Sequence, residues 1–278
     1  WVPKNKKDAE KIRNKQLKPT DIKEENRDYK EVKFLTTDEV EGKVEAVFSA
    51  GSTGATLISA ITILGKQRGV IRPAIASVLP TVDRSVILLD SGASLDVKPK
   101  VLFQFALMGS KLAEALFDIE APKIGLLNNG EEESKGRELE KSAFKLLNSS
   151  SLNFIGNVEG RDFATSKVDV FVTDGFTGNV VLKTLEGTAK LQQNLISNSL
   201  KQNLFKPFLP SVKKALKPVK DQLNPDKTNA SYLLGVDGLV TIGHGSSKQE
   251  AIMNGINYTN ESIKKDFIGK FSDAIREL

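Results

Sequence analysis

The stretch VEAVFSAGSTGATLISAITILGK, residues 44–66, joins a short apolar run to a cluster of small polar residues and then to a segment with helical spacing. The apolar run is too short for a helix and too continuous for a half-exposed strand, which is typical of a buried strand in a parallel sheet. The same order recurs along the rest of the chain. We therefore predict an α/β fold, with a mostly parallel sheet flanked by helices and right-handed crossovers between strands.

The expected strands share this continuous apolar character and cover residues 44–48, 85–89, 123–127, 152–155, 168–173 and 238–242. The expected helices have apolar residues at helical spacing and cover residues 54–66, 99–117, 131–147, 178–204 and 247–271. Clusters rich in Gly, Ser, Asp or Asn follow the strands. Because ligands bind beyond the carboxyl ends of strands in open α/β sheets, we expect these clusters to converge on one cleft. The competing interpretation is that short turns simply need such residues.

The composition limits the chemistry that the chain can perform. Its 278 residues suffice for one large domain or two closely packed ones, and no apolar run approaches the roughly 18 residues of a membrane span. There is no cysteine and only one histidine, which excludes disulfides, thiolate catalysis and zinc sites built from Cys or several His. We predict no metal site and no cofactor.

Charge is unevenly distributed along the chain. The formal net charge is +5, and residues 190–220 hold seven lysines and no acidic residue. Residues 1–35 are dense in charge and lack sustained periodicity, so we predict a charged N-terminal arm of unassigned role before an α/β domain over residues 36–278. A nucleic-acid surface would interleave basic and aromatic residues on a folded face, so no nucleic-acid partner is predicted.

A protruding helical hairpin is predicted over residues 188–224, where two amphipathic segments flank a tip broken by Pro207 and Pro210. Apolar side chains among lysines have the composition of an interfacial membrane anchor, or of a surface that receives an acidic protein. Alternatively, the apolar stripe packs on the body or on a second copy of the chain. The candidate contact residues are Phe205, Lys206, Phe208, Leu209, Lys213 and Lys214.

Residues 49–54, SAGSTG, directly precede an apolar helix. Successive N–H groups and the hydroxyls of Ser52 and Thr53 would therefore face outward at the positive end of a helix dipole, as in an anion site. Neither a Walker P-loop nor a Gly-x-Gly-x-x-Gly dinucleotide fingerprint is present. Ordinary helix capping is the competing interpretation.

Residues 174–183 place a carboxylate at a strand end, followed by glycines and by an amide and an ammonium one helical turn apart. Asp174, Gly178, Asn179 and Lys183 could orient a phosphate or polarise a carbonyl. Alternatively, Asp174 caps the helix and Lys183 is an ordinary surface residue.

Other strand-end loops add further candidates. His244 lies with Ser246 in a Gly-Ser loop, where it is either a catalytic group or a hydrogen-bonded structural histidine. Asp90, Asn128 and Glu131 are candidate cleft residues, although a carboxylate at a helix start is also favoured by the dipole alone.

Ordered motifs from about residue 44 to the C-terminus resemble the bacterial phosphate acyltransferase PlsX family. They are SAGSTGA at 49–55, RPAIA at 72–76, QFALMG at 104–109, GLLN at 125–128 with GEE at 130–132, NFIGNVEGRD at 153–162, DGFTGNVVLK at 174–183 and HGSS at 244–247. The resemblance implies a fold like that of phosphotransacetylases and isocitrate-type dehydrogenases. It also implies a homodimeric cytoplasmic enzyme that touches the membrane surface.

The resemblance further implies that a fatty acyl group moves from the thioester of acyl carrier protein to inorganic phosphate, which gives acyl phosphate for phospholipid synthesis. Phosphate is already a nucleophile near neutral pH, so the protein has to position it and stabilise the oxyanion, without a covalent enzyme intermediate. The alternatives left open are an acyl-CoA-dependent phosphotransacylase, a non-catalytic membrane-associated binding protein and a dehydrogenase of similar fold.

On this interpretation the candidate residues divide by role. Asp174, Asn179 and Lys183 orient phosphate and carbonyl, and His244 with Ser246 serves the oxyanion or the leaving thiolate. The expected phosphate cradle consists of Ser49, Gly51, Ser52, Thr53 and Gly54.

Overall fold

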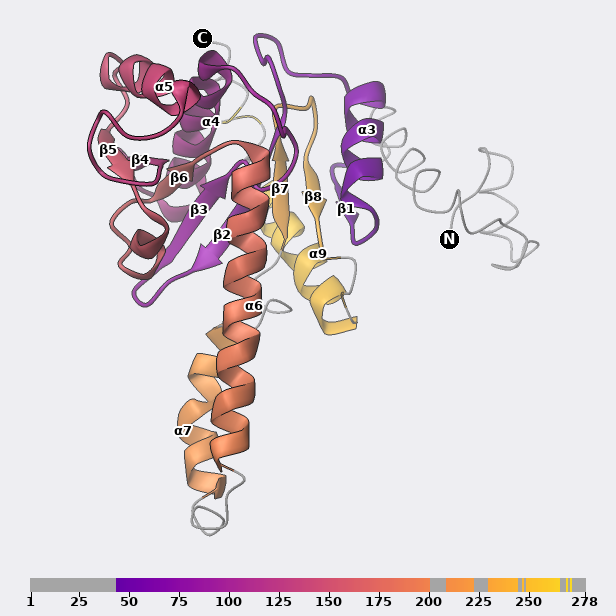
Figure 1. Cartoon of the computed structure of the whole chain (residues 1–278). Helices are drawn as coiled ribbons and strands as arrows, with labels where there is room; N and C mark the ends of the chain where they lie inside the picture. Colours follow the sequence, from indigo (N-terminus) through magenta and orange to yellow (C-terminus); the bar gives the residue numbers. More distant parts are fainter. Residues whose placement is uncertain are drawn as a thin grey trace, which may run out of the picture.

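The computed structural model describes residues 44–200, 209–222, 230–244, 247, 249–265, 269 and 271. Within these residues the chain forms an eight-stranded sheet with helices on both faces (Figure 1). This arrangement confirms the predicted α/β fold class. The charged arm predicted for residues 1–35 lies outside the described residues.

The sheet is mixed, and two parallel groups of strands run in opposite directions. Its order is β1(Val47–Ser49), β8(Val240–Ile242), β7(Ser231–Leu234), β2(Ala74–Pro80), β3(Ser85–Leu89), β6(Val170–Val172), β4(Ile124–Leu127) and β5(Phe154–Val158). β1 and β8 are parallel, as are β3, β6, β4 and β5, and three antiparallel pairings separate the groups. Because the number of reversals is odd, the carboxyl ends of the two groups lie at opposite edges of the sheet.

The described helices either cover a face of the sheet or extend beyond it (Figure 1). They are α3(Thr53–Ile63), α4(Pro99–Phe117), α5(Glu138–Asn148), α6(Gly175–Leu200), α7(Leu209–Gln222) and α9(Gln249–Lys264), with a short 3₁₀ helix, η3(Gly160–Ala164). Successive side chains of β3 point to opposite faces of the sheet. Ile87 and Leu89 pack in the core under α4 and α5. Leu88, which points to the other face, packs in the cluster that contacts Val181 and Leu182 of α6.

Two central strands, β2 and β7, were not predicted. β2 reads AIASVLP, with small residues and a terminal proline, and β7 has only four residues, so neither gives a sustained apolar run. One predicted helix start was also wrong: residues 131–137 precede α5, which begins at Glu138 rather than Glu131. Gly136 has a φ of 89°, a left-handed conformation that interrupts a helix.

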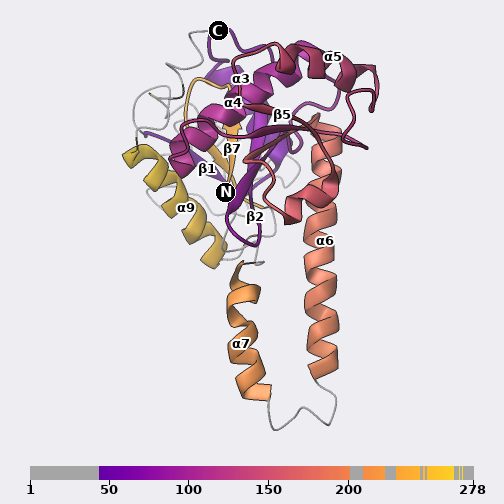
Figure 2. The same cartoon turned by 90° about the vertical axis from the view of Figure 1, so that its left-hand side faces the viewer.

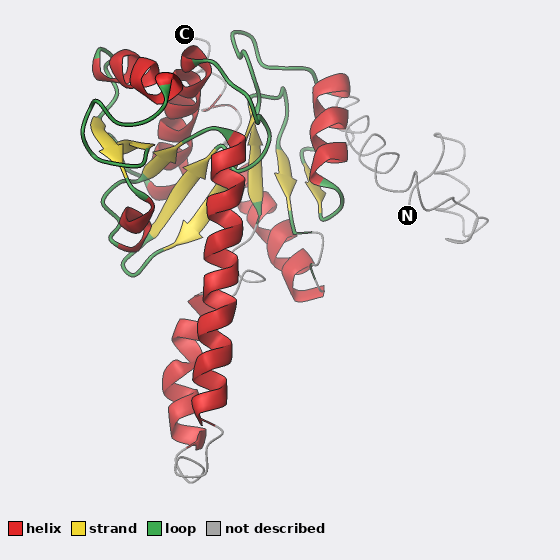
Figure 3. Ribbon diagram, in the orientation of Figure 1, coloured by secondary structure: helices red, strands yellow, loops and turns green. Residues whose placement is uncertain are grey.

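α6 and α7 project away from the sheet as the predicted hairpin (Figures 1, 2 and 3). The distal half of α6 carries exposed apolar side chains, including Leu191 at 57% and Leu195 at 58% exposure. Among the described residues, no helix combines the length and the apolar character that a bilayer crossing requires.

The start of α6 fits tightly against the loop after β3. A Cβ on Gly178 would lie 1.9 Å from the carbonyl oxygen of Asp90, whereas a Cβ on Gly187 of the same helix would meet nothing within 4 Å. We expect Gly178→Ala to lower the free energy of unfolding by about 1–3 kcal/mol, because the helix start must shift. Gly187→Ala is the matched control and should raise it by about 0.5–1 kcal/mol. Urea denaturation of both variants measures this; equal effects would contradict the packing.

Candidate active site

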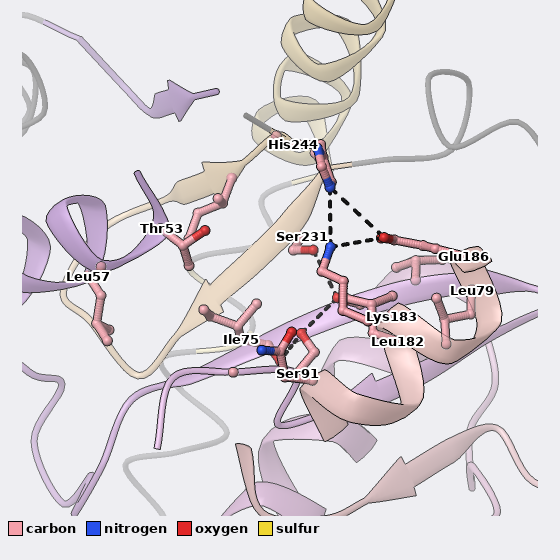
Figure 4. Close-up of a pocket in the computed structure, with 18 of the residues that line it drawn as sticks. Thr53, Leu57, Ile75, Leu79, Ser91, Leu182, Lys183, Glu186, Ser231 and His244 are labelled. Carbon is pink, nitrogen blue, oxygen red and sulfur yellow. Dashed lines mark hydrogen bonds and ion pairs between the residues drawn. The ribbon is translucent and has the colours of Figure 1, made fainter. Parts of the chain in front are cut away.

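A cavity of about 480 Å³ lies between α3 and α6, on the face of the sheet that these helices cover (Figure 4). β2 and β7 form its floor, and the loops after β1, β3 and β8 contribute to its walls. The predicted site residues that line it are Gly51, Thr53, Gly54, Asn179, Lys183 and His244. Segments widely separated in the sequence therefore meet at one site.

The loops after β4 and β5 do not reach this cavity, so the expectation of one cleft for all strand-end clusters does not hold. In the order of the sheet, β4 and β5 are the last two strands, and β3 and β6 separate them from β2 and β7, which form the floor of the cavity. Asn128 and Glu131 are not among the described lining residues. Asn128 Nδ2 donates to the Lys135 carbonyl at 3.2 Å, and Lys167 Nζ donates to Glu131 Oε1 at 2.8 Å.

The first turn of α3 forms one wall of the cavity. Ser52 is the N-cap, and its hydroxyl accepts the N–H of Ala55 at 3.3 Å. The Ser49 hydroxyl accepts the N–H of Gly51 at 3.3 Å. Both hydroxyls thus shape the turn and neither residue lines the cavity, which is lined here by Gly51, Thr53 and Gly54. The first N–H groups of a helix lack intrahelical acceptors, so this wall suits an anion.

One face of α6 forms the opposite wall. Its lining residues Asn179, Leu182, Lys183 and Glu186 follow the spacing that places side chains on one side of a helix. Lys183 Nζ donates to Glu186 Oε2 at 2.9 Å and lies 3.2 Å from His244 Nε2. His244 Nε2 is 3.9 Å from the same carboxylate oxygen. Figure 4 shows these three side chains together at the cavity.

Glu186 was not predicted as a site residue. Its position three residues after Lys183 offered a signal, since that spacing brings side chains together on a helix. The sequence did not indicate that His244 would join the pair.

Asp90 does not line the cavity but organises the loop that does. Its carboxylate accepts the backbone N–H groups of Ile75, Gly92, Ala93 and Ser94 at 3.0, 3.0, 2.9 and 2.7 Å. Burial raises the pKa of the Asp90 carboxyl in spite of these four donors. The loop presents Ser91 and Gly92 to the cavity, and Gly178 packs against the Asp90 backbone.

Asp174 caps α6 outside the cavity lining. Its carboxylate accepts the N–H and hydroxyl of Thr177 at 2.8 and 2.9 Å and forms an ion pair with Arg137, which also pairs with Glu140. Burial by itself would raise the pKa of Asp174, but the hydrogen bonds from Thr177 and Arg137 outweigh it and hold the pKa below its usual range. The pKa of Arg137 is raised by its hydrogen bonds to Glu140 and Asp174.

Among the predicted contact residues of the hairpin, Lys214 has a described side chain, which is exposed on α7. Phe205, Lys206 and Phe208 lie outside the described residues, and only the backbone of Leu209 and Lys213 is described. Ser246, predicted to serve phosphate or the oxyanion, also lies outside the described residues.

Three lining serines, Ser77, Ser91 and Ser231, were also missed as site residues. Two of them lie on β2 and β7, the strands that the apolar pattern did not reveal. A strand over residues 74–80 would point alternate side chains to opposite faces, which places Ile75, Ser77 and Leu79 on one face. This spacing was the available signal for Ser77. Among the described residues there is no cluster of metal-ligating side chains that could hold an ion.

Comparison with known proteins adds a family-level match. Residues 26–270 match the family model described as "Fatty acid synthesis protein". A protein named phosphate acyltransferase from Elusimicrobium minutum is 42% identical over 245 residues, which cover 85% of this chain and 70% of that protein. Another of that name from Thermodesulfovibrio yellowstonii is 43% identical over 237 residues, covering 85% of this chain and 69% of that protein.

Solved structures support the fold. A phosphotransacetylase from Streptococcus pyogenes superposes with a TM-score of 0.54 at 17% identity, covering 84% of this chain and 67% of that one. A branched-chain phosphotransacylase from Enterococcus faecalis gives a TM-score of 0.53 at 13% identity, covering 84% of this chain and 78% of that one. At these identities the similarity concerns the fold alone.

The lowered pKa of Asp174 makes its contribution to stability dependent on pH. A carboxylate whose pKa is lower in the folded than in the unfolded protein stabilises the fold at pH values above the unfolded pKa. This contribution is lost as the pH falls through the folded pKa. We expect Asp174→Asn to lower the free energy of unfolding by about 1–3 kcal/mol near neutral pH. The difference from wild type should shrink as the pH falls below about 4.

Urea denaturation across this pH range measures the difference, with Asp96→Asn as the control at an exposed carboxylate. A difference between wild type and Asp174→Asn that stayed constant down to low pH would contradict the assignment.

Proposed function

This chain belongs to the PlsX family of phosphate acyltransferases, and on that premise we propose that it moves a fatty acyl group from the thioester of acyl carrier protein to inorganic phosphate. The product is an acyl phosphate, which we propose serves phospholipid synthesis. The single observation that carries the proposal is the cavity, which sets the first turn of α3 opposite Lys183 and His244.

The α3 wall supports phosphate binding. Thr53 and Gly54 present the first turn of an 11-residue helix to the cavity, where N–H groups and the helix dipole favour an anion. Ser49 and Ser52 hold the turn in shape rather than face the ligand. In our proposal phosphate therefore contacts backbone N–H groups and the Thr53 hydroxyl.

Apolar side chains support binding of the acyl group. The cavity is lined by Leu57 from α3, by Ile75 and Leu79 from β2, by Leu182 from α6 and by Ile242 from β8. Burial of an alkyl chain against such a lining is favourable at about 0.8 kcal/mol for each methylene group. A binding site with an anion wall and apolar neighbours matches the two substrates of the proposed reaction.

The proposed reaction is a direct displacement at the thioester carbonyl. A phosphate oxygen attacks the carbonyl carbon, the new C–O bond forms, and the carbonyl electron pair moves to oxygen. Collapse of this oxyanion breaks the C–S bond, and the thiolate leaves with its electron pair. Lys183 and Asn179 orient phosphate and carbonyl, and His244 protonates the leaving sulfur or stabilises its charge.

The proposed partners rest on surface chemistry. The lysine-rich segment 190–220 fits an acidic carrier protein or an anionic membrane surface. Exposed Leu191 and Leu195 on α6 support packing against a second copy of the chain, because monomers rarely leave such a stripe uncovered.

The central test is formation of acyl phosphate, trapped as hydroxamate with hydroxylamine, from acyl carrier protein thioester and phosphate. We expect Lys183→Ala to reduce kcat/KM by about 100-fold or more, since it removes the ammonium that orients both substrates. Lys111→Ala is the matched control, because Lys111 forms the same kind of i,i+3 pair, with Glu114 on α4, outside the cavity lining. Omission of phosphate should abolish the product, and full turnover by Lys183→Ala would overturn the proposed role.

The same assay decides between the proposed donor and its alternatives. With acyl carrier protein and acyl-CoA thioesters at equal concentration, we expect faster turnover from the carrier protein. Faster turnover from acyl-CoA would favour the acyl-CoA-dependent phosphotransacylase. Absence of acyl phosphate with either donor would favour the binding protein without catalysis.

The proposed membrane contact is tested by sedimentation with anionic liposomes. We expect Phe205→Ser, Phe208→Ser and Leu209→Ser together to reduce the bound fraction, because they remove the apolar side chains of the predicted tip. Val82→Ser, at a side chain 78% exposed in the turn between β2 and β3, is the control. Unchanged sedimentation of the triple variant would count against the anchor.

A further inference from the structure

A row of three serine hydroxyls crosses the floor of the cavity. Ser91 Oγ lies 2.7 Å from Ser77 Oγ, which in turn lies 2.9 Å from Ser231 Oγ. The three residues come from the loop after β3, from β2 and from the first position of β7. Ser77 and Ser91 are 4% and 5% exposed, and Ser231 is partly buried. The row is therefore a shielded polar path inside a largely apolar lining.

The protons of this row can be arranged in two directions. In the first direction, Ser231 donates to Ser77, and Ser77 donates to Ser91. Ser91 then donates to the Ile75 carbonyl at 3.1 Å. Ser231 then offers only lone pairs to the cavity. If the direction reverses, Ser91 donates to Ser77 and Ser77 to Ser231, whose O–H is free to donate into the cavity. The Ile75 carbonyl keeps the N–H of Ser91 at 2.8 Å, so reversal leaves no buried acceptor unpaired.

The row ends where the two substrates of the proposed reaction would meet. Ser231 lines the cavity together with Thr53 on the α3 wall and Lys183 on the α6 wall. Figure 4 shows Ser231 at the end of the row toward Lys183 and His244, with Ser91 at the other end. Because the hydroxyls are shielded from water and polarise one another, a donor at the end of such a row is stronger than an isolated hydroxyl.

We propose that Ser231 is a further catalytic residue, whose hydroxyl donates a hydrogen bond to the thioester carbonyl oxygen as that oxygen becomes an oxyanion, with Ser77 and Ser91 as positioning residues behind it. The inference rests on the proposed acyl transfer and adds a donor to its cavity. When phosphate attacks the carbonyl carbon, the electron pair moves to oxygen and the row adopts the direction in which Ser231 donates. When the C–S bond breaks, the row returns, and no proton leaves it.

A purely structural role is the alternative, because the hydroxyls also join β2, β7 and the loop after β3. The two roles differ in what they change. A structural link affects the free energy of unfolding, whereas a donor to the oxyanion affects kcat and leaves the KM for phosphate unchanged. A hydroxyl that instead bound ground-state phosphate would raise the KM for phosphate.

The decisive variant is Ser231→Ala in the acyl phosphate assay. We expect kcat to fall by about 100-fold, the loss typical of removing one oxyanion donor, with the KM for phosphate unchanged. Ser231→Thr keeps a hydroxyl and should restore most of kcat. Ser94→Ala is the matched control, since Ser94 is 8% exposed, donates to the Pro73 carbonyl at 3.3 Å and does not line the cavity. It should retain wild-type kcat.

Ser77→Ala tests the row behind the donor. We expect a smaller loss of kcat than for Ser231→Ala, and we expect the double variant to be no slower than Ser231→Ala, because Ser77 acts only through Ser231. Ser77→Ala also keeps the proposal testable if Ser231→Ala does not fold. Additive losses in the double variant would overturn the row as a unit.

Three results would overturn the role of Ser231: unchanged kcat in Ser231→Ala, a change confined to the KM for phosphate, or failure of Ser231→Thr to restore turnover. In each of these cases an active wild type leaves the proposed function standing. A wild type that forms no acyl phosphate would overturn the proposed function itself, and this inference with it.

Discussion

The buried carboxylate of Asp90 is the interaction on which the candidate site depends. It accepts four backbone N–H groups, one from β2 and three from the loop that follows β3, so strand and loop cannot move independently. A buried carboxylate is tolerated only with such partners. Because Gly178 packs directly on the Asp90 backbone carbonyl, the same residue also sets where α6 starts. The wall that carries Asn179 and Lys183 is thus positioned from a residue outside the cavity.

The direction of the strands decides what each can contribute. A parallel strand that is followed by a helix contributes to a site mainly through the residues after its carboxyl end, as β1 does with Gly51 and Thr53. β7 and β2 run antiparallel to each other across the middle of the sheet, and they offer side chains from the strands themselves. Ser231 and Ser77 reach the cavity in this way. The floor of the site therefore carries polar groups among apolar side chains such as Ile75 and Leu79.

The sequence predicted the parts of the molecule that a single local pattern encodes. α4 spans Pro99–Phe117, the range predicted from helical spacing, and strand 85–89 matches β3. The short strands β2 and β7 lack such a pattern and depend on neighbours far away in the chain. Their omission hid both the reversal between the two parallel groups and the position of the cavity over β2 and β7. The sequence therefore did not show that Asn128 and Glu131, which follow β4 near the end of the sheet, lie away from the cavity.

The helix α6 explains why some candidates near one another in sequence separate in space. Asn179, Lys183 and Glu186 recur at intervals of four and three residues, so they share the face that borders the cavity. Asp174 precedes the first turn, where its carboxylate is bound by Thr177 and Arg137. An N-cap side chain points back to its own helix start and cannot also extend along the helix face. The motif at 174–183 therefore combines two functions, anchoring the helix with Asp174 and presenting Asn179 and Lys183 to the site.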